Sequence, residues 1–406
     1  MRDRLAKDGG EPVRTKPFAA WPVYGEEEEQ ALLRVLRSGK WGKLDGPEVE
    51  TFERRFADYH QARYGIGVVN GTVSLRIALL AAGIRAGDEV IVPPYTFLAT
   101  ATAVVEANAT PVFADIELET FNIDPRAIEA AITPRTKAII PVHMGGLPAD
   151  MDAILDIARR HRLAVIEDAA HAHGAEYRGR RVGAIGHMGS FSFQSTKNLN
   201  SGEGGIVTTS DDRLAEACRS IHNCGRAPGR PWYEHHMIAG NYRLSEFQGA
   251  ILNAQFGRLE EQCRVRERNG TYLAGLLSRL PGIIPQTRDP RCTRHGYHLF
   301  LLRLDPAILG VSREAFLNAL AAEGVPICAG YPWPLYRQPL FQRRAFGPFS
   351  ACARGMDYGR VCCPACERIC YEQGAWMEQR LLLGPQDDMD DIARAFQKVY
   401  ENRDKL

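Results

Sequence analysis

The sequence has no excess of charge of one sign. Its 406 residues include 50 basic and 49 acidic side chains, for a formal net charge of +1. The short basic cluster from Arg159 to Arg162 lies within a helical pattern, as a solvated helix face does. Because nucleic acids and anionic membranes attract clustered positive charge, we expect neither of them as a partner.

Long apolar runs are also missing. A membrane-spanning helix needs roughly 20 consecutive apolar residues, and the apolar runs of this chain are well short of that. Charges are scattered through the first sixteen residues, which is unlike the continuous apolar segment of a secretory leader. The sequence therefore predicts a soluble, cytoplasmic protein.

Cysteine is absent from the first half of the chain. All ten cysteines lie between Cys218 and Cys370, a distribution unlike a disulfide framework, so we expect reduced thiols. One Cys-x-x-Cys pair occurs in a cluster near Cys366, but a zinc site needs a second well-spaced pair with histidines. Since Cys363, Cys366 and Cys370 follow helical spacing, we interpret them as partly buried residues of a helix.

Short β-branched segments alternate with helical stretches from about Tyr64 to Thr209. This pattern is typical of an α/β fold with a mainly parallel sheet wrapped by helices. Asp124-Pro125 and Asp150 are typical residues at helix starts. Seven strands are predicted in one sheet, at residues 66–69, 90–93, 111–114, 138–142, 164–168, 190–194 and 205–208.

The length of the chain predicts two domains, because it exceeds what one compact core usually holds. A long helical stretch from about Leu244 to Leu277 leads away from the predicted sheet, and the composition changes after Pro281-Gly282. We predict an extended N-terminal arm (1–15), a large domain (16–280) and a small α+β domain (281–406). The small domain is expected to have strands at 299–304 and 325–328, a helix beginning at Ser312 and a closing helix from about Asp387.

The first predicted strand ends in Asn70-Gly71-Thr72, where a helical pattern begins. Such a turn presents free backbone N–H groups, a hydroxyl group and the positive end of a helix to a phosphate. Threonine is also an ordinary residue in the first turn of a helix. Phosphate binding and simple helix initiation are therefore both open for Gly71 and Thr72 on this pattern alone.

Asp168 and Lys197 are the two charged residues that the pattern places beside core strands. Asp168 ends a predicted buried parallel strand, where open α/β sheets bind ligands. A carboxylate there can keep a pyridine nitrogen protonated, although capping the next turn is an equal alternative. Lys197 lies in a turn between two predicted strands. Most lysines are solvated, but a lysine held in this way can attack an aldehyde if its amine is partly neutral.

Four segments, in this order, resemble the DegT-type sugar aminotransferases: Asn70 to Leu75, Glu167 to Gly174, Ser192 to Gly205 and Gly240 to Leu244. The resemblance extends from about Gly9 to Gly384. It implies the aspartate-aminotransferase fold, which is fold type I of pyridoxal 5′-phosphate (PLP) enzymes. It also implies a homodimer whose active sites are shared between subunits.

The resemblance assigns a role to each matching residue. Lys197 forms the Schiff base with PLP and shuttles the proton during amino transfer, with pyridoxamine 5′-phosphate as the intermediate form. Asp168 pairs with the pyridinium nitrogen and Phe97 stacks on the ring. His171, where many members have glutamine, lies near the cofactor oxygen.

The remaining cofactor contacts follow from the same resemblance. Gly71, Thr72 and Ser192 hold the phosphate, and Asn241 reaches in from the partner subunit. Substrate contacts are expected from Trp41, His143 and Tyr331. For these three residues, packing at a domain junction is the alternative.

One branch of the family is the most similar. The segments Gly9 to Arg14, Pro141 to Gly146 and Cys363-Pro364 resemble glutamine-dependent scyllo-inosose aminotransferases and 3-amino-5-hydroxybenzoate synthases. This implies glutamine or glutamate as the donor and a keto cyclitol or keto sugar as the acceptor, in aminocyclitol or amino-sugar biosynthesis. Two segments depart from the hydroxybenzoate type: Ser195-Thr196 before the lysine, and Met377 to Arg380, where those proteins tend to have histidines.

Three other functions stay open at this point. A combined aminotransferase and aromatising dehydratase would act on an aminobenzoate precursor. A nucleotide-sugar aminotransferase would use the same chemistry on a different acceptor. A regulatory protein that only keeps the fold is the non-enzymatic alternative, although no DNA-binding module or basic helix is present.

Overall fold

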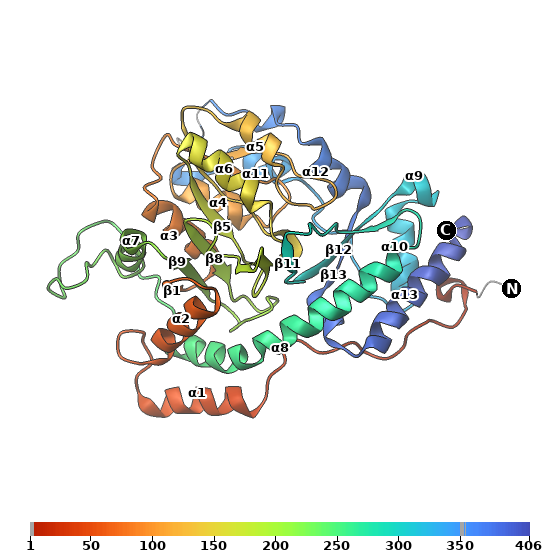
Figure 1. The fold of residues 1–406 in the computed structure, drawn as a ribbon, viewed down its shortest axis with the longest axis horizontal. Helices are drawn as coiled ribbons and strands as arrows, with labels where there is room; N and C mark the ends of the chain where they lie inside the picture. Colours follow the sequence, from red (N-terminus) through yellow and green to blue (C-terminus); the bar gives the residue numbers. More distant parts are fainter. Residues whose placement is uncertain (1–3, 350–352, 354) are drawn as a thin grey trace.

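The computed structural model describes residues 4–349, 353 and 355–406, which form two main sheets joined by a long helix (Figure 1). The larger sheet has seven strands in the order β1-β9-β8-β5-β4-β2-β3. Only β9 runs against its neighbours, so the sheet is mainly parallel. All seven predicted strands are confirmed, as β1 (Tyr64–Val68), β2 (Glu89–Val92), β3 (Thr110–Phe113), β4 (Thr136–Ile139), β5 (Ala164–Asp168), β8 (Met188–Ser192) and β9 (Gly205–Thr209).

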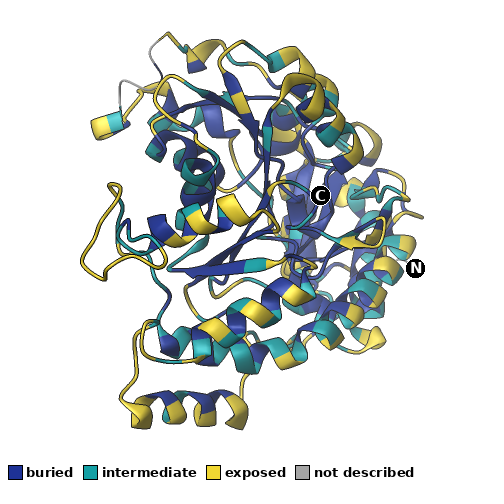
Figure 2. Ribbon diagram, turned by 60° about the vertical axis from the view of Figure 1, so that its left-hand side comes forward, coloured by how far each residue is buried: buried dark blue, intermediate teal, exposed yellow. Residues whose placement is uncertain are grey.

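Helices cover the larger sheet, and its central strands are buried (Figure 2). Several helices begin at residues whose side chains accept a backbone N–H, as at Asn70, Asp124 and Asp150. The predicted helix starts are thus confirmed. The helices of this part are α1 (Glu26–Ser38), α2 (Glu48–Tyr59), α3 (Gly71–Ala81), α4 (Ala99–Glu106), α5 (Pro125–Ala131), α6 (Met151–His161) and α7 (Asp212–His222).

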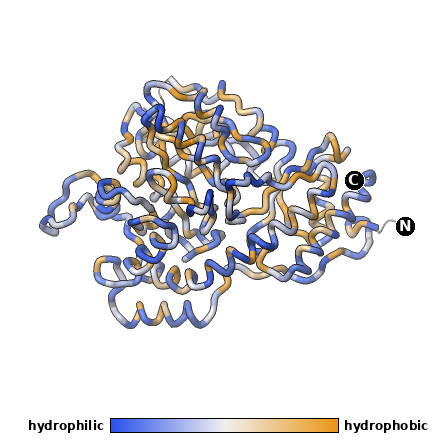
Figure 3. Tube along the Cα trace, in the orientation of Figure 1, coloured by the Kyte–Doolittle hydropathy of each residue, from blue (hydrophilic) through white to orange (hydrophobic). Residues whose placement is uncertain are grey.

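The second sheet is antiparallel, with the order β10-β12-β13. The predicted strand at 299–304 is confirmed, and Ser312 caps the predicted helix α10. Apolar residues of this sheet and its helices form one buried cluster, and hydrophobic and hydrophilic residues alternate along these helices in Figure 3. The elements are β10 (Ile283–Pro285), β12 (Leu299–Leu304), α9 (Pro306–Leu309), α10 (Arg313–Ala322), β13 (Gly374–Glu378) and α13 (Gln386–Glu401).

The predicted strand at 325–328 is wrong. Within this segment only Cys328 forms a β-bridge, with Trp376. Pro326 has no N–H to donate to a ladder, and Gly330 turns the chain at a φ of 77°. The segment is extended but cannot continue as a strand.

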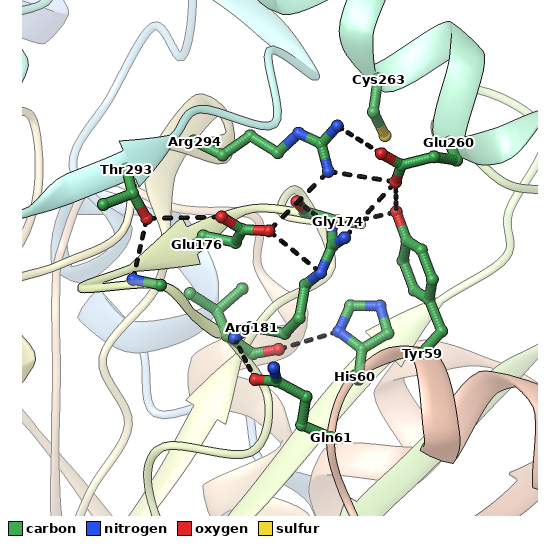
Figure 4. A network of polar contacts seen from close by, with 12 residues as sticks. Tyr59, His60, Gln61, Gly174, Glu176, Arg181, Glu260, Cys263, Thr293 and Arg294 are labelled. Carbon is green, nitrogen blue, oxygen red and sulfur yellow. Dashed lines mark hydrogen bonds and ion pairs between the residues drawn. The ribbon is translucent and has the colours of Figure 1, made fainter.

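Helix α8 (Glu246–Leu277) runs from the larger sheet to the smaller one (Figure 1). Ser245 and Gln248 form a capping box at its start. Near its middle, Glu260 binds the Tyr59 hydroxyl at 2.8 Å and the Arg294 guanidinium at 2.7 Å (Figure 4). Glu260 also pairs with Arg181. The helix thereby ties α2 to the three-stranded sheet of β6 (Glu176–Tyr177), β7 (Arg180–Arg181) and β11 (Cys292–Arg294).

The part of the chain between α10 and β13 packs back onto the larger sheet. Phe113 of β3 contacts the rings of Tyr336, Phe341 and Tyr358. The segment contains α11 (Pro339–Gln342) and α12 (Pro364–Arg368), with a π-helical turn at Ile369–Gln373. In the sequence, the larger sheet thus precedes the predicted boundary at residue 281 and the β10-β12-β13 sheet follows it. In space, however, segments from the two sides of this boundary pack against one another.

The N-terminal segment runs past α13, near the C-terminus (Figure 1). Leu5 is buried in the core of that region. Arg14 binds the carboxylates of Asp388 and Asp391 at 2.7 and 2.8 Å. Contacts with α10 and α13 therefore hold this segment in place.

The nine described cysteines are free thiols, and Cys363, Cys366 and Cys370 are buried at α12 and the turn after it. The predicted helical setting is confirmed for Cys366 and Cys370, but Cys363 directly precedes α12 and has non-helical backbone angles. In the described part of the chain, we find no helix with the length and apolar character to cross a membrane.

Candidate active site

A cavity of about 990 Å³ opens at the carboxyl ends of the parallel strands, between the two sheets. Open α/β sheets bind their ligands at this edge. The predicted residues that line the cavity are Gly71, Thr72, Phe97, Asp168, His171, Ser192, Lys197 and Tyr331.

The first wall of the cavity is the start of α3. Its first N–H groups point out of the helix end and have no partner within the helix. A Cβ atom added to Gly71 would lie 2.7 Å from Cβ of Ser192, and one added to Gly205 would lie 2.5 Å from the carbonyl carbon of Asn70. Glycine at both positions therefore lets the helix start approach β8 and β9. The result is a narrow cradle of N–H groups beside the Ser192 hydroxyl.

The second wall is formed by Asp168 at the end of β5. Its Oδ2 accepts a hydrogen bond from Oγ1 of Thr100 at 2.8 Å, and its Oδ1 accepts one from the N–H of Ala170 at 3.3 Å. Burial raises the pKa of Asp168, while these hydrogen bonds and Lys197 oppose the rise. A fixed, buried carboxylate thus faces the cavity. Sequence reasoning missed Thr100, since a threonine within α4 has no local signal of such a role.

Lys197 lies in a tight turn between β8 and β9. The N–H of Lys197 donates to the backbone oxygen of Gln194 at 2.9 Å, and the N–H of Ser201 donates to that of Phe193 at 3.0 Å. Burial lowers the pKa of Lys197 to about 8, although the charge of Asp168 opposes this. A much larger fraction of this amine is neutral at physiological pH than of an ordinary lysine.

Two histidines lie next to the lysine. Nε2 of His298 is 3.5 Å from Nζ of Lys197, and the rings of His298 and His171 have centroids 4.4 Å apart. Burial, followed by the charge of Lys197, lowers the pKa of each histidine well below its ordinary value. Both are therefore neutral. Sequence reasoning missed His298, whose only signal is its place directly before the strand at 299–304.

Aromatic rings close the side of the cavity toward the smaller sheet. Tyr331 packs edge-on against Trp376 and Tyr95, with centroids 4.8 and 5.3 Å apart. Burial raises the pKa of Tyr331, as does the charge of Asp168. Phe97 lines the cavity from the larger sheet's side and is 61% exposed. Its exposed ring is free to stack on a planar ligand.

Three predicted site residues do not line this cavity. His143 is fully buried, with Nε2 donating to Glu167 at 3.0 Å and Nδ1 accepting from the N–H of Ala149 at 3.1 Å. Trp41 is 51% exposed and packs on Phe247. Asn241 is exposed and forms a bridge with Asn223 after α7.

The residues of the cavity fit PLP. The cradle at Gly71 suits a phosphate, and a carboxylate at Asp168 suits a protonated pyridine nitrogen. Nδ1 of His171 is buried without a partner in the described structure, so it is free to bind a polar atom of a ligand. Lys197 supplies the partly neutral amine that an aldehyde requires.

Comparison with known proteins supports the same assignment. The family model described as DegT/DnrJ/EryC1/StrS aminotransferases matches residues 22–366. The L-glutamine:2-deoxy-scyllo-inosose aminotransferase of Streptoalloteichus tenebrarius is 40% identical, over 100% of both chains. The 3-amino-5-hydroxybenzoate synthase of Amycolatopsis mediterranei is 37% identical, over 93% of this chain and 98% of that protein.

The fold agrees with these sequence matches. The crystal structure of a 3-amino-5-hydroxybenzoic acid synthase covers 96% of this chain, and the chain covers 100% of it, with a TM-score of 0.85 and 36% identity. The predicted fold of a PLP-dependent aminotransferase is therefore confirmed. By its sequence and its fold, the chain belongs to the DegT/DnrJ/EryC1/StrS aminotransferase family of PLP-dependent enzymes.

Proposed function

We propose that this enzyme moves an amino group from glutamine or glutamate to the keto group of a cyclitol or a cyclitol-like sugar. The observation that carries the proposal is Lys197, whose pKa is lowered to about 8 in a cavity that it shares with the buried carboxylate of Asp168. A solvated lysine would have neither the partly neutral amine nor the fixed counter-charge.

The chain's own residues would hold the cofactor as the cavity suggests. Gly71, Thr72 and Ser192 bind the phosphate, Phe97 covers one face of the ring, and Asp168 holds the ring nitrogen protonated. When bound, PLP supplies an aldehyde that accepts the amino group and a ring that stores electrons from the substrate carbon.

Lys197 has two duties in this scheme. Its Nζ would hold the aldehyde of bound PLP until the amine of the donor displaces it. As a free, partly neutral amine, Nζ would be placed to take the proton of the donor carbon and to hold it for return. In the second half of the cycle, Nζ would return a proton to the carbon of the keto acceptor.

The choice of substrates rests on the relatives. The named proteins from Streptoalloteichus tenebrarius and Streptomyces kanamyceticus are L-glutamine:2-deoxy-scyllo-inosose aminotransferases, 40% and 41% identical to this chain. The similarity to 3-amino-5-hydroxybenzoate synthase favours an aminobenzoate precursor as the second candidate acceptor. Both acceptors are six-membered carbocycles. Tyr331 and its aromatic neighbours would form one wall for such a ring.

We also propose a homodimer with shared active sites. Asn241 does not line the cavity of its own chain, and it lies on the exposed connection between α7 and α8 (Figure 1). The same connection exposes Trp232 by 69%, Tyr233 by 78% and Ile238 by 105%. Apolar side chains on a projecting segment are suited to an interface. A second copy would cover them and receive Asn241 in its cavity.

A spectroscopic half-reaction tests the proposed function. Protein loaded with PLP should absorb near the edge of the visible range, lose that band with glutamine or glutamate and recover it with 2-deoxy-scyllo-inosose. Lys197→Ala should complete the cycle at less than a thousandth of the wild-type rate. A normal rate in Lys197→Ala would refute the assignment of the lysine. Recovery of the band only with an aminobenzoate precursor or only with a nucleotide-linked keto sugar would refute the acceptor.

A further inference from the structure

Asn198 follows Lys197 in the chain, yet its side chain contacts residues about 100 positions away. Its amide nitrogen donates to the backbone oxygen of Gly296 at 2.7 Å, and its amide oxygen lies 3.2 Å from Nδ1 of His298. The side chain is buried. Because a backbone oxygen only accepts hydrogen bonds, the NH₂ group of Asn198 has to face Gly296. The amide oxygen is therefore turned toward His298.

This orientation decides which ring nitrogen of His298 carries a hydrogen. An amide oxygen accepts hydrogen bonds, so Nδ1 has to donate. The buried ring is neutral and holds one hydrogen only, since burial and Lys197 lower its pKa well below the ordinary value. Nε2 is therefore left with a lone pair. That nitrogen is the one that lies 3.5 Å from Nζ of Lys197.

We propose that Asn198 and His298 act as a pair of positioning residues for the amine of Lys197. The lone pair on Nε2 of His298 attracts one N–H of the lysine and holds it on that side of the cavity. The lone pair of the lysine amine is then directed at the reacting carbon. Only the catalytic consequence of this inference rests on the proposed function, because the tautomer of His298 follows from the contacts alone.

The other groups around Lys197 are consistent with a neutral His298. Asp168 faces the lysine from the end of β5. His171 and His173 come shortly after Asp168 in the chain. Burial lowers the pKa of both histidines as well. The positive charge of Arg266, from α8, also acts on His298. A second proton on His298 would place another cation among Lys197 and Arg266, so the single Nδ1 hydrogen is the favoured state.

The tautomer can be measured without any activity. Two-bond ¹H–¹⁵N spectra of the full-length protein, labelled at histidine, distinguish a protonated Nδ1 from a protonated Nε2. The signal of His298 is assigned by its loss in His298→Phe. We expect a protonated Nδ1 in the wild type and in Asn198→Asp, whose carboxylate also accepts a hydrogen bond. In Asn198→Leu we expect the hydrogen to move to Nε2.

Asn200 offers a matched control in the same turn. It is buried like Asn198, but no hydrogen bond connects its side chain to His298 in the described structure. Asn200→Leu should leave the His298 tautomer unchanged. A wild-type His298 protonated at Nε2, or an Asn198→Leu variant with the wild-type tautomer, would overturn the inference.

Single-turnover kinetics test the consequence for the reaction. Asn198→Leu and His298→Phe should each slow the reaction of the PLP-loaded enzyme with glutamine on the order of tenfold, with little change in KM. Asn198→Asp should keep most of the rate. The double variant should be no slower than either single variant, because the two residues act as one unit. Independent, multiplying effects would refute the pair. If no amino donor reacts at all, the proposed function fails while the NMR result still decides the tautomer.

Discussion

Oγ1 of Thr100 lies 2.8 Å from Oδ2 of Asp168, so the first turn of α4 holds the carboxylate at the end of β5. Thr100 is 1% exposed and its hydroxyl also lies 3.0 Å from that of Thr96. The hydroxyl stabilises the ionised form of Asp168 in a place where burial disfavours it. In the proposed function the carboxylate needs this help, because only its ionised form can pair with a pyridinium nitrogen.

Thr100→Val should therefore shift the pH profile. Valine has no hydroxyl group, so the hydrogen bond that lowers the pKa of Asp168 is lost. The pKa of Asp168 should then rise further. In the proposed function, activity requires ionised Asp168 and is lost as pH falls, so the acid limb of kcat/KM should move to higher pH. Loss of a hydrogen bond to a buried carboxylate costs about 1–3 kcal/mol, so the Tm of the PLP-free protein should fall, although the N–H of Ala170 still binds Oδ1. Thr102→Val is the control, since Thr102 bonds to the backbone oxygen of Leu98 instead.

The lowered pKa of Lys197 predicts selective chemical labelling. In PLP-free protein, acetic anhydride should modify Lys197 with a midpoint near pH 8, because only the neutral amine reacts. Asp168 raises the pKa of Lys197 by attraction, so Asp168→Asn should move the midpoint to lower pH. Mass spectrometry of the Lys197 peptide gives the extent of labelling, with exposed Lys137 as the internal reference. A midpoint above pH 10 would mean that the amine is solvated.

The close approach of Gly71 to Ser192 predicts a specific rescue. In Gly71→Ala the new methyl group would lie 2.7 Å from Cβ of Ser192, so α3 has to shift. Overpacking of this kind costs typically 1–3 kcal/mol. We expect a lower Tm and a large loss of phosphate affinity. Adding Ser192→Gly removes the nearest atom and should recover part of the Tm but not the phosphate affinity, since the hydroxyl is lost. Equal Tm values for Gly71→Ala with and without Ser192→Gly would show that the crowding is unimportant.

Arg380 is the one guanidinium among the described residues that line the cavity. Its Nε binds Oε2 of Glu378 at 2.9 Å, in the segment that departs from the hydroxybenzoate type. A donor amino acid brings a carboxylate that a guanidinium binds well. Arg380→Gln should raise KM for glutamine about tenfold with little change in KM for the keto acceptor. Arg360→Gln, which changes an exposed residue outside the cavity, is the control. An equal rise for both substrates would argue against donor binding.

Local patterns predicted most of the fold. The seven strands of the larger sheet and the helix starts at Asp124 and Asp150 each depend on a few neighbouring residues, so periodicity and capping were enough. The strand predicted at 325–328 was wrong, because the segment has the apolar residues of a strand but Pro326 prevents the ladder. Since proline has no N–H to donate, Pro326 alone could have excluded this strand.

The site was harder to predict, because it is assembled from distant segments. The sequence pattern placed three residues at a common edge of one sheet, because each of them ends or follows a strand: Gly71, Asp168 and Lys197. His298 contacts Lys197, and Thr100 contacts Asp168, only because distant segments pack together. No local sequence motif predicts these contacts. His143 has the same kind of position at a strand end, yet its ring turns inward to Glu167. Side-chain direction at a strand end depends on the tertiary neighbours.

A subunit-mixing experiment tests whether the active sites are shared. One variant, Lys197→Ala, lacks the amine but keeps Asn241, and a second variant, Asn241→Ala, keeps the amine. In a mixed dimer with shared sites, one cavity combines the intact Lys197 of one chain with the intact Asn241 of the other, while the second cavity lacks both. Random mixing makes about half of the dimers mixed, each with one intact site of two, so activity should rise to about a quarter of the wild type.

Mixing has a different result if each chain completes its own site. Every cavity would then contain either the Lys197→Ala or the Asn241→Ala change, and the activity of the mixture would equal the average of the two separate variants. Refolding the two variants together, with each refolded alone as the control, distinguishes these outcomes. Solvent protection of exposed side chains is a second test of the dimer. Only if a dimer forms should solvent be excluded from Trp232, Tyr233 and Ile238. A monomer with full activity would refute both the dimer and the proposed role of Asn241.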